Sequence, residues 1–286
     1  MRLILVHGRD QQGKDRQALQ RVWTEALDVG LDAAGLPSIR EHEVVFPYYA
    51  DDLIAMANEI RSAPMRGVIA KGAEPQEAGL DSVQIALLQE MLGEDAVAGA
   101  AQDEALHKGA QNTALALALA RLADRSEFGR GLLTKLTEDV SIYLQHQVVA
   151  KRVNDFVASA IGTQPCVVVA HSLGSIVAYR VLRELGATAR VQRLITLGSP
   201  LGLHTVRKLL SPPARVFPAG VGSWVNAFDP ADIVALIPLE EAAWPISPAI
   251  LNHSSVKNHT DNRHGISGYL DDPTVARAIY QALRAT

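Results

Sequence analysis

The residue best placed for chemistry is a serine at the junction between an expected strand and an expected helix. Residues 166–170 form a continuous apolar run typical of a strand buried on both faces, and residues 173–185 have helical spacing. Ser172 falls at the bend between them. Ala170 and Gly174 flank it two positions away on either side, and such small residues let strand and helix approach closely. The hydroxyl of Ser172 is therefore a candidate nucleophile.

The segment Ala170-His171-Ser172-Leu173-Gly174 resembles the nucleophile elbow of the α/β-hydrolase superfamily, in its serine lipase and esterase branch. The usual form is G-x-S-x-G, so Ala170 is a sterically mild departure. The alternative is an ordinary helix N-cap, in which Ser172 would satisfy free backbone N–H groups. We interpret the adjacent His171 as a packing residue rather than as a base. The resemblance covers Leu3 to Leu283 by element order, but only the elbow is highly specific.

The resemblance implies a carboxylate that follows the serine in the chain, and two aspartates compete for this role. The segment from Trp224 runs as a strand into a turn that holds Asp229 and Asp232. We favour Asp232, because Asp232-Ile233-Val234 looks like the acid loop of lipases. Asp229 before Pro230 is more typical of a turn residue.

The catalytic base should be a histidine in the C-terminal segment, which offers His253, His259 and His264. We assign His264, because it lies in a Gly-rich loop shortly before the last helix, where the superfamily carries its base. His259 is the next candidate, and the plain alternative is that all three are solvated loop residues. A metal site that includes Asp261 is disfavoured, because the spacings match no metal-binding motif.

The same resemblance implies an oxyanion hole made of two backbone N–H groups. One belongs to Leu173 at the start of the helix, and the other to Arg9, because Val6-His7-Gly8-Arg9 is similar to the H-G motif of the family. The side chains of Arg9, Gln11 and Gln12 would then line the site.

A competing interpretation of the first loop is a phosphate-binding P-loop, since residues 8–15 nearly match G-x-x-x-x-G-K-[ST]. The motif needs a Ser or Thr hydroxyl after Lys14 to bind Mg²⁺, and this chain has Asp15, whose carboxylate would repel phosphates. We therefore expect Lys14 and Asp15 to form the first turn of a helix.

The order of elements predicts an α/β fold with a mostly parallel sheet of about six strands, helices on both faces and a helical insertion. Expected strands lie at residues 3–6, 42–46, 66–70, 166–170, 191–197 and 224–228, and expected helices at 17–31, 51–60, 83–92, 113–123, 136–161, 173–185 and 274–284. We expect a single α/β-hydrolase domain over residues 1–286. Residues 71–130 form its insertion, which could cap the nucleophile or simply pack on the sheet.

Composition excludes several classes of protein. The chain has 286 residues, of which 48% are hydrophobic and 20% charged, a balance typical of a folded domain with a large core. The net charge of −4 leaves no basic surplus for nucleic acid. The single cysteine, Cys166, cannot form an intramolecular disulfide. We found no signal peptide and no apolar run long enough for a transmembrane helix, and we expect a cytoplasmic protein.

These patterns together predict a serine hydrolase that cleaves carboxylic esters with Ser172, His264 and Asp232. We expect no cofactor and no metal, and a small ester or acyl compound as substrate. Thioesterase, phospholipase or acyltransferase activity on the same triad remains an alternative, because the pocket decides among them. A non-catalytic ligand-binding protein of the same fold is the second hypothesis. The sequence does not predict an oligomeric state.

Overall fold

The computed structural model describes residues 1–9, 11–62, 81–92, 127–210 and 215–285. Its centre is a sheet of six strands in the order β2-β1-β3-β4-β5-β6, and every pairing is parallel. The strands are β1 (Arg2–Val6), β2 (Val44–Val45), β3 (Cys166–His171), β4 (Val191–Leu197), β5 (Trp224–Ala227) and β6 (Leu251–His253). The expected α/β class with six parallel strands is confirmed. The expected strand at 66–70 lies outside the described residues.

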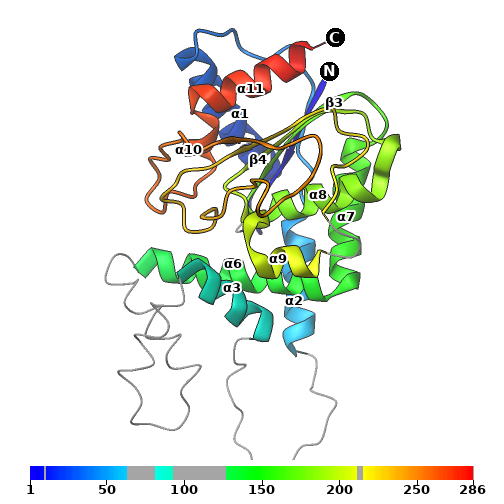
Figure 1. Ribbon diagram of the computed structural model, residues 1–286, viewed down its shortest axis with the longest axis vertical. Coiled ribbons are helices and arrows are strands. Elements are labelled where there is room, and N and C mark those ends of the chain that lie inside the picture. Colours follow the sequence, from blue (N-terminus) through cyan, green and yellow to red (C-terminus); the bar gives the residue numbers. More distant parts are fainter. Residues whose placement is uncertain (10, 63–80, 93–126, 211–214, 286) are drawn as a thin grey trace, which may run out of the picture.

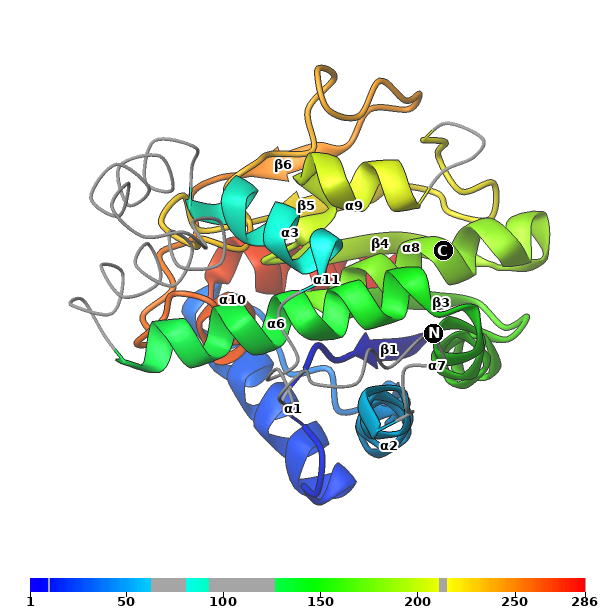
Figure 2. The same ribbon diagram turned by 90° about the horizontal axis from the view of Figure 1, so that it is seen from below.

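Helices cover both faces of this sheet (Figure 1). On one face lie α1 (Arg16–Ala33), α10 (Ser267–Leu270) and α11 (Pro273–Arg284), which contact one another. The other face carries α2 (Ala50–Ser62), α3 (Ser82–Leu92), α6 (Glu127–Gln145), α7 (Gln147–Ile161), α8 (Leu173–Leu185) and α9 (His204–Leu209). Figure 2, which is seen from below, shows α3 and α6 side by side in front of the sheet on this second face.

The alternating side chains of the strands divide the core into two clusters. Ile4, Val168 and Ala170 pack toward α7 and α8, whereas Leu3, Val167 and Val169 pack toward α1 and α11. This is the period of two expected for a strand buried on both faces. All six residues of β3 are buried, which explains the unbroken apolar run that marked it in the sequence.

Two boundaries differ from the sequence-based expectation. The helix expected at 136–161 is two helices, because the backbone of His146 is extended (φ −105°, ψ 99°) between α6 and α7. The strand expected at 42–46 is only Val44–Val45, which lies at the edge of the sheet. Strand β6, at the other edge, was not expected from the sequence.

Part of the expected insertion at 71–130 can be described. Helix α3 lies within it and packs against α6 and α9, and Glu90 accepts hydrogen bonds from the backbone N–H groups of His204 and Thr205 at the start of α9. Residues 71–80 and 93–126, with the helix expected at 113–123, lie outside the described residues. None of the described helices is both long and apolar enough to cross a membrane.

Candidate active site

The turn between β3 and α8 holds Ser172 in a backbone conformation that few non-glycine residues adopt (φ 54°, ψ −129°). A Cβ on Gly174 would lie 2.5 Å from the carbonyl oxygens of Val6 and His7, so only a glycine lets α8 approach β1 here. The Ser172 side chain makes no capping hydrogen bond to α8. The N-cap alternative is therefore wrong, and the hydroxyl points to another partner.

That partner is His264. Its Nε2 lies 2.9 Å from Ser172 Oγ, and its Nδ1 lies 2.7 Å from Asp232 Oδ2. Because a carboxylate only accepts hydrogen bonds, Nδ1 carries the proton and Nε2 is left to accept the serine hydroxyl. Ser172 follows the carboxyl end of β3, and Asp232 and His264 lie in two loops that are more than thirty residues apart in the sequence. The structure brings the three side chains into one hydrogen-bonded line.

All three residues are shielded from solvent, with Ser172 1%, His264 4% and Asp232 0% exposed. Hydrogen bonds in such a low-dielectric setting are stronger than in water, and an unpaired charge there would be costly. Asp232 is fully partnered, because its Oδ1 accepts the backbone N–H of Val234 at 2.9 Å.

The other candidate residues have different partners. Asp229 accepts hydrogen bonds from the backbone N–H groups of Ala231 and Asn258, which fits a turn residue. His259 is exposed and lies 2.6 Å from Asp271. His253 belongs to β6, where its carbonyl accepts the N–H of Phe228. Among the described residues, no three His, Cys, Asp or Glu side chains converge as metal ligands, and Asp261 is in no such group.

His171 holds the loop of His264 and contacts neither Ser172 Oγ nor Asp232 through a hydrogen bond that is observed among the described residues. Its Nε2 donates to the carbonyl oxygen of His264 at 2.8 Å, and the two imidazole rings lie 4.8 Å apart. Burial lowers the pKa of His171 well below its usual value, and the neighbouring His264 lowers it further. His171 is thus a neutral ring that holds the loop of His264, which agrees with its interpretation as a packing residue.

The loop after β1 lies directly against the elbow. A Cβ on Gly8 would be 2.9 Å from Ser172 Cβ, so this loop and the serine are in contact. Leu173 is the first residue of α8, where a backbone N–H has no partner within the helix. Arg9 follows Gly8, so its backbone N–H belongs to the loop that contacts Ser172, and the roles of Leu173 and Arg9 as oxyanion donors stay predictions.

The side chain of Arg9 turns away to a partner that the sequence did not indicate. Its Nε lies 2.9 Å from Asp139 Oδ2 on α6, and both side chains are buried. Gln11 donates to the carbonyl of Arg9 at 2.8 Å, whereas Gln12 is exposed. A buried ion pair of this kind fixes the loop that carries the candidate oxyanion donor.

His7 anchors the other side of the same loop. Its Nδ1 donates to Gly8 O at 2.6 Å, its Nε2 accepts the backbone N–H of Tyr49 at 3.2 Å, and its ring stacks on Tyr49 with centroids 4.0 Å apart. Burial lowers the pKa of His7 to about 4, so the ring is neutral at pH 7.

The P-loop interpretation does not fit this geometry. Asp15 is the N-cap of α1 and accepts the N–H of Ala18 at 2.6 Å. Lys14 Nζ lies 3.3 Å from the side-chain oxygen of Gln11, and the N–H of Gly13 donates to Asp51. Lys14 and Asp15 thus lie at the start of α1, as expected. The backbone N–H group of Gly13, which a phosphate would need, already donates to the carboxylate of Asp51, and that of Ala18 donates to the carboxylate of Asp15.

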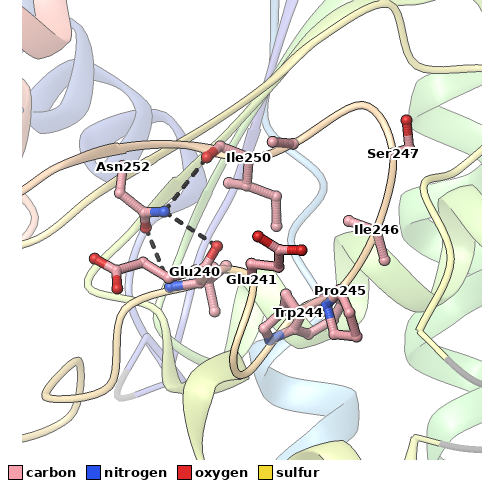
Figure 3. A pocket seen from close by; sticks show the side chains of 10 residues that line it. Glu240, Glu241, Trp244, Pro245, Ile246, Ser247, Ile250 and Asn252 are labelled. Atoms are coloured by element: carbon pink, nitrogen blue, oxygen red, sulfur yellow. Dashed lines mark hydrogen bonds between the residues drawn. The ribbon is translucent and has the colours of Figure 1, made fainter.

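A pocket of about 560 Å³ lies elsewhere, in the loop between β5 and β6 (Figure 3). Asn252 supports its wall, because its amide bonds the backbone of Leu239 and Ile250. Glu240 and Glu241 give the pocket a negative rim. Neither Ser172 nor His264 lines it.

In comparisons of the chain with known protein families, curated proteins and solved structures, nothing matches.

Proposed function

We propose that this protein is a serine hydrolase of the α/β-hydrolase superfamily that cleaves carboxylic esters. The observation that carries the proposal is the buried line of hydrogen bonds from Ser172 through His264 to Asp232, with distances of 2.9 and 2.7 Å. A serine hydroxyl is a weak nucleophile until a base removes its proton, and a carboxylate that fixes the imidazole tautomer completes the arrangement. The chain order Ser, Asp, His is the order of that superfamily.

In the proposed reaction, Ser172 Oγ attacks the ester carbonyl carbon while His264 Nε2 takes the hydroxyl proton. The negative charge that develops on the carbonyl oxygen is stabilised by the backbone N–H groups of Leu173 and Arg9. His264 then gives its proton to the alkoxide as the carbon–oxygen bond breaks. An alcohol leaves, and the acyl group remains on Ser172.

The second half of the proposed reaction uses water. His264 removes a proton from a water molecule, whose oxygen attacks the acyl carbon, and Ser172 leaves with a proton returned by His264. The products are a carboxylic acid and the free enzyme. Asp232 keeps its charge throughout and stabilises the imidazolium. No cofactor takes part, and the cytoplasmic location expected from the sequence stays a prediction.

The test is covalent labelling with a fluorophosphonate, followed by intact mass and peptide mapping. We expect one adduct per chain, on Ser172, and its loss in Ser172→Ala. Ser159→Ala is the matched control, because Ser159 is exposed on α7 and its hydroxyl only donates to the carbonyl of Asp155. That variant should be labelled like the wild type.

A folded wild-type protein without an adduct would contradict the proposal and favour a ligand-binding protein of the same fold. If labelling succeeds, a panel of p-nitrophenyl esters, acyl thioesters and phospholipids separates esterase from thioesterase and phospholipase activity. Transfer of the acyl group to an added alcohol would identify an acyltransferase.

A further inference from the structure

Tyr269, on α10, contacts the carboxylate of the proposed triad. Its side chain is fully buried, and its hydroxyl donates to Asp232 Oδ2 at 2.6 Å. The same oxygen accepts Nδ1–H of His264 at 2.7 Å. The phenol oxygen in turn accepts the backbone N–H of Asp229 at 3.3 Å. The hydroxyl therefore makes one hydrogen bond as a donor and one as an acceptor, and together they fix the position of the ring.

A hydroxyl that donates to a carboxylate stabilises the negative charge and makes the oxygen a weaker acceptor for other protons. Tyr269 and His264 therefore compete for one oxygen. Burial, together with the charge of Asp232, raises the pKa of Tyr269 far above its usual range. Tyr269 consequently keeps its proton at neutral pH and remains a donor to Asp232.

The other titratable groups around the pair do not duplicate this effect. His171 packs on His264 and is kept neutral by burial. The carboxylate of Asp229 lies near the guanidinium of Arg263, with Nη1 at 3.5 Å, and accepts two backbone N–H groups. Among the described side chains, Tyr269 is the one besides His264 for which a hydrogen bond to Asp232 is observed.

We infer that Tyr269 is a positioning residue of the proposed triad, which fixes Asp232 through its hydroxyl and shares the oxygen Oδ2 with His264. The catalytic meaning of this inference rests on the proposed function, but its effect on the His264 ring does not. Without the hydroxyl, Asp232 would attract the imidazolium more strongly, and His264 would remain protonated to higher pH.

The test compares Tyr269→Phe with the wild type in two measurements. The first is the pH dependence of the rate of fluorophosphonate labelling, and the second is an NMR titration of the His264 ring. We expect both midpoints to move up by about 0.5 to 1 pH unit in Tyr269→Phe, while the labelling rate at high pH falls less than about tenfold. Tyr280→Phe on α11 is the matched control and should leave both midpoints unchanged.

A merely structural role would lower the labelling rate at every pH without moving either midpoint, and that result would overturn the inference. If no protein is labelled but the NMR midpoint rises, the proposed function fails while the inference about Tyr269 stands. If Tyr269→Phe does not fold, the wild type still provides the test. The buried hydroxyl proton of Tyr269 should give a slowly exchanging downfield NMR resonance, whose chemical shift changes with pH at the same midpoint as the His264 ring. A chemical shift that stays constant through this midpoint would overturn the inference.

Discussion

Asp229 and Asp232 lie three residues apart in one turn, yet their carboxylates face different partners. Asp232 bonds the imidazole of His264, whereas Asp229 accepts the backbone N–H of Ala231 in its own turn and that of Asn258 in the loop after β6. The sequence could rank the two only by their neighbours along the chain. The distinction depends on which carboxylate reaches a histidine more than thirty residues away, and no local pattern encodes that.

The amide variant of each aspartate separates their roles. In Asp232→Asn an amide nitrogen can donate to Nδ1, which places the imidazole proton on Nε2 and prevents it from accepting the Ser172 hydroxyl. We expect the rate of fluorophosphonate labelling to fall by about 10⁴-fold. Asp229→Asn, the control, should reduce stability and leave labelling within about tenfold of the wild type. Equal losses in both variants would contradict the assignment of Asp232.

Gly198, directly after β4, provides a second prediction. Its φ is +53°, and a Cβ there would lie 3.0 Å from Asp232 Oδ2 and 3.1 Å from His264 Nδ1. Gly198→Ala should therefore cost about 1 to 2 kcal/mol of stability and also displace the His–Asp pair, with a labelling rate at least about tenfold lower.

Gly186→Ala is the matched control for this variant. Gly186 has nearly the same φ, +54°, but a Cβ there meets nothing within 4 Å. It should lose a similar amount of stability in urea unfolding and label at the wild-type rate. If Gly186→Ala is also labelled more slowly than the wild type, then backbone strain alone, and not contact with Asp232 and His264, explains the lower labelling rate of Gly198→Ala.

At the scale of elements, the ion pair between Arg9 and Asp139 joins the loop after β1 to helix α6. Removal of one partner from a buried pair leaves an uncompensated charge, so Asp139→Asn should lower the free energy of unfolding by about 3 to 5 kcal/mol. Asp155→Asn, which breaks the exposed pair with Lys151, should cost under about 1 kcal/mol. Urea unfolding measures both, and equal costs would contradict a structural role for the buried pair.

The elements that the sequence predicted well are those with long apolar runs. Strands β1, β3 and β4 are fully or mostly buried, so their composition reflects their position. Strand β6 has three residues, and its Leu251 is 56% exposed, so no apolar run marked it. The break at His146 has neither glycine nor proline, so no local signal in the sequence marked it.

The site was predictable where a motif is local and not where contacts are distant. The elbow at Ser172 stands in a single short segment. Tyr269, Asp139 and Gly198 have no distinguishing neighbours in the sequence, and each acquires its role only when the sheet brings separate loops together. The signal that could have suggested Tyr269 is its position five residues after His264, on the helix that follows the catalytic loop.

For the whole molecule, buried His7 makes stability depend on pH. Its folded pKa of about 4 is below the unfolded value of 6.5, so the unfolded chain binds more protons between these values. Stability should therefore be complete above pH 6.5 and fall as the pH drops toward 4, by about 3 kcal/mol from this residue. Urea unfolding between pH 7 and 4.5 measures the slope. His7→Asn should reduce this slope and leave the part that buried His171 contributes, and an unchanged slope would contradict the prediction.

The order of strands also bears on how the chain can fold during synthesis. Strand β1 ends at Val6, but one of its two neighbours, β3, begins at Cys166. The sheet therefore cannot close around β1 until the residues of β3 have been synthesised, and pairings so distant in sequence form slowly. His264 and Tyr269 are synthesised later still. The hydroxyl of Ser172 is therefore synthesised before its hydrogen-bonding partner, and the line from Ser172 through His264 to Asp232 can form only after residue 264 has been added to the chain.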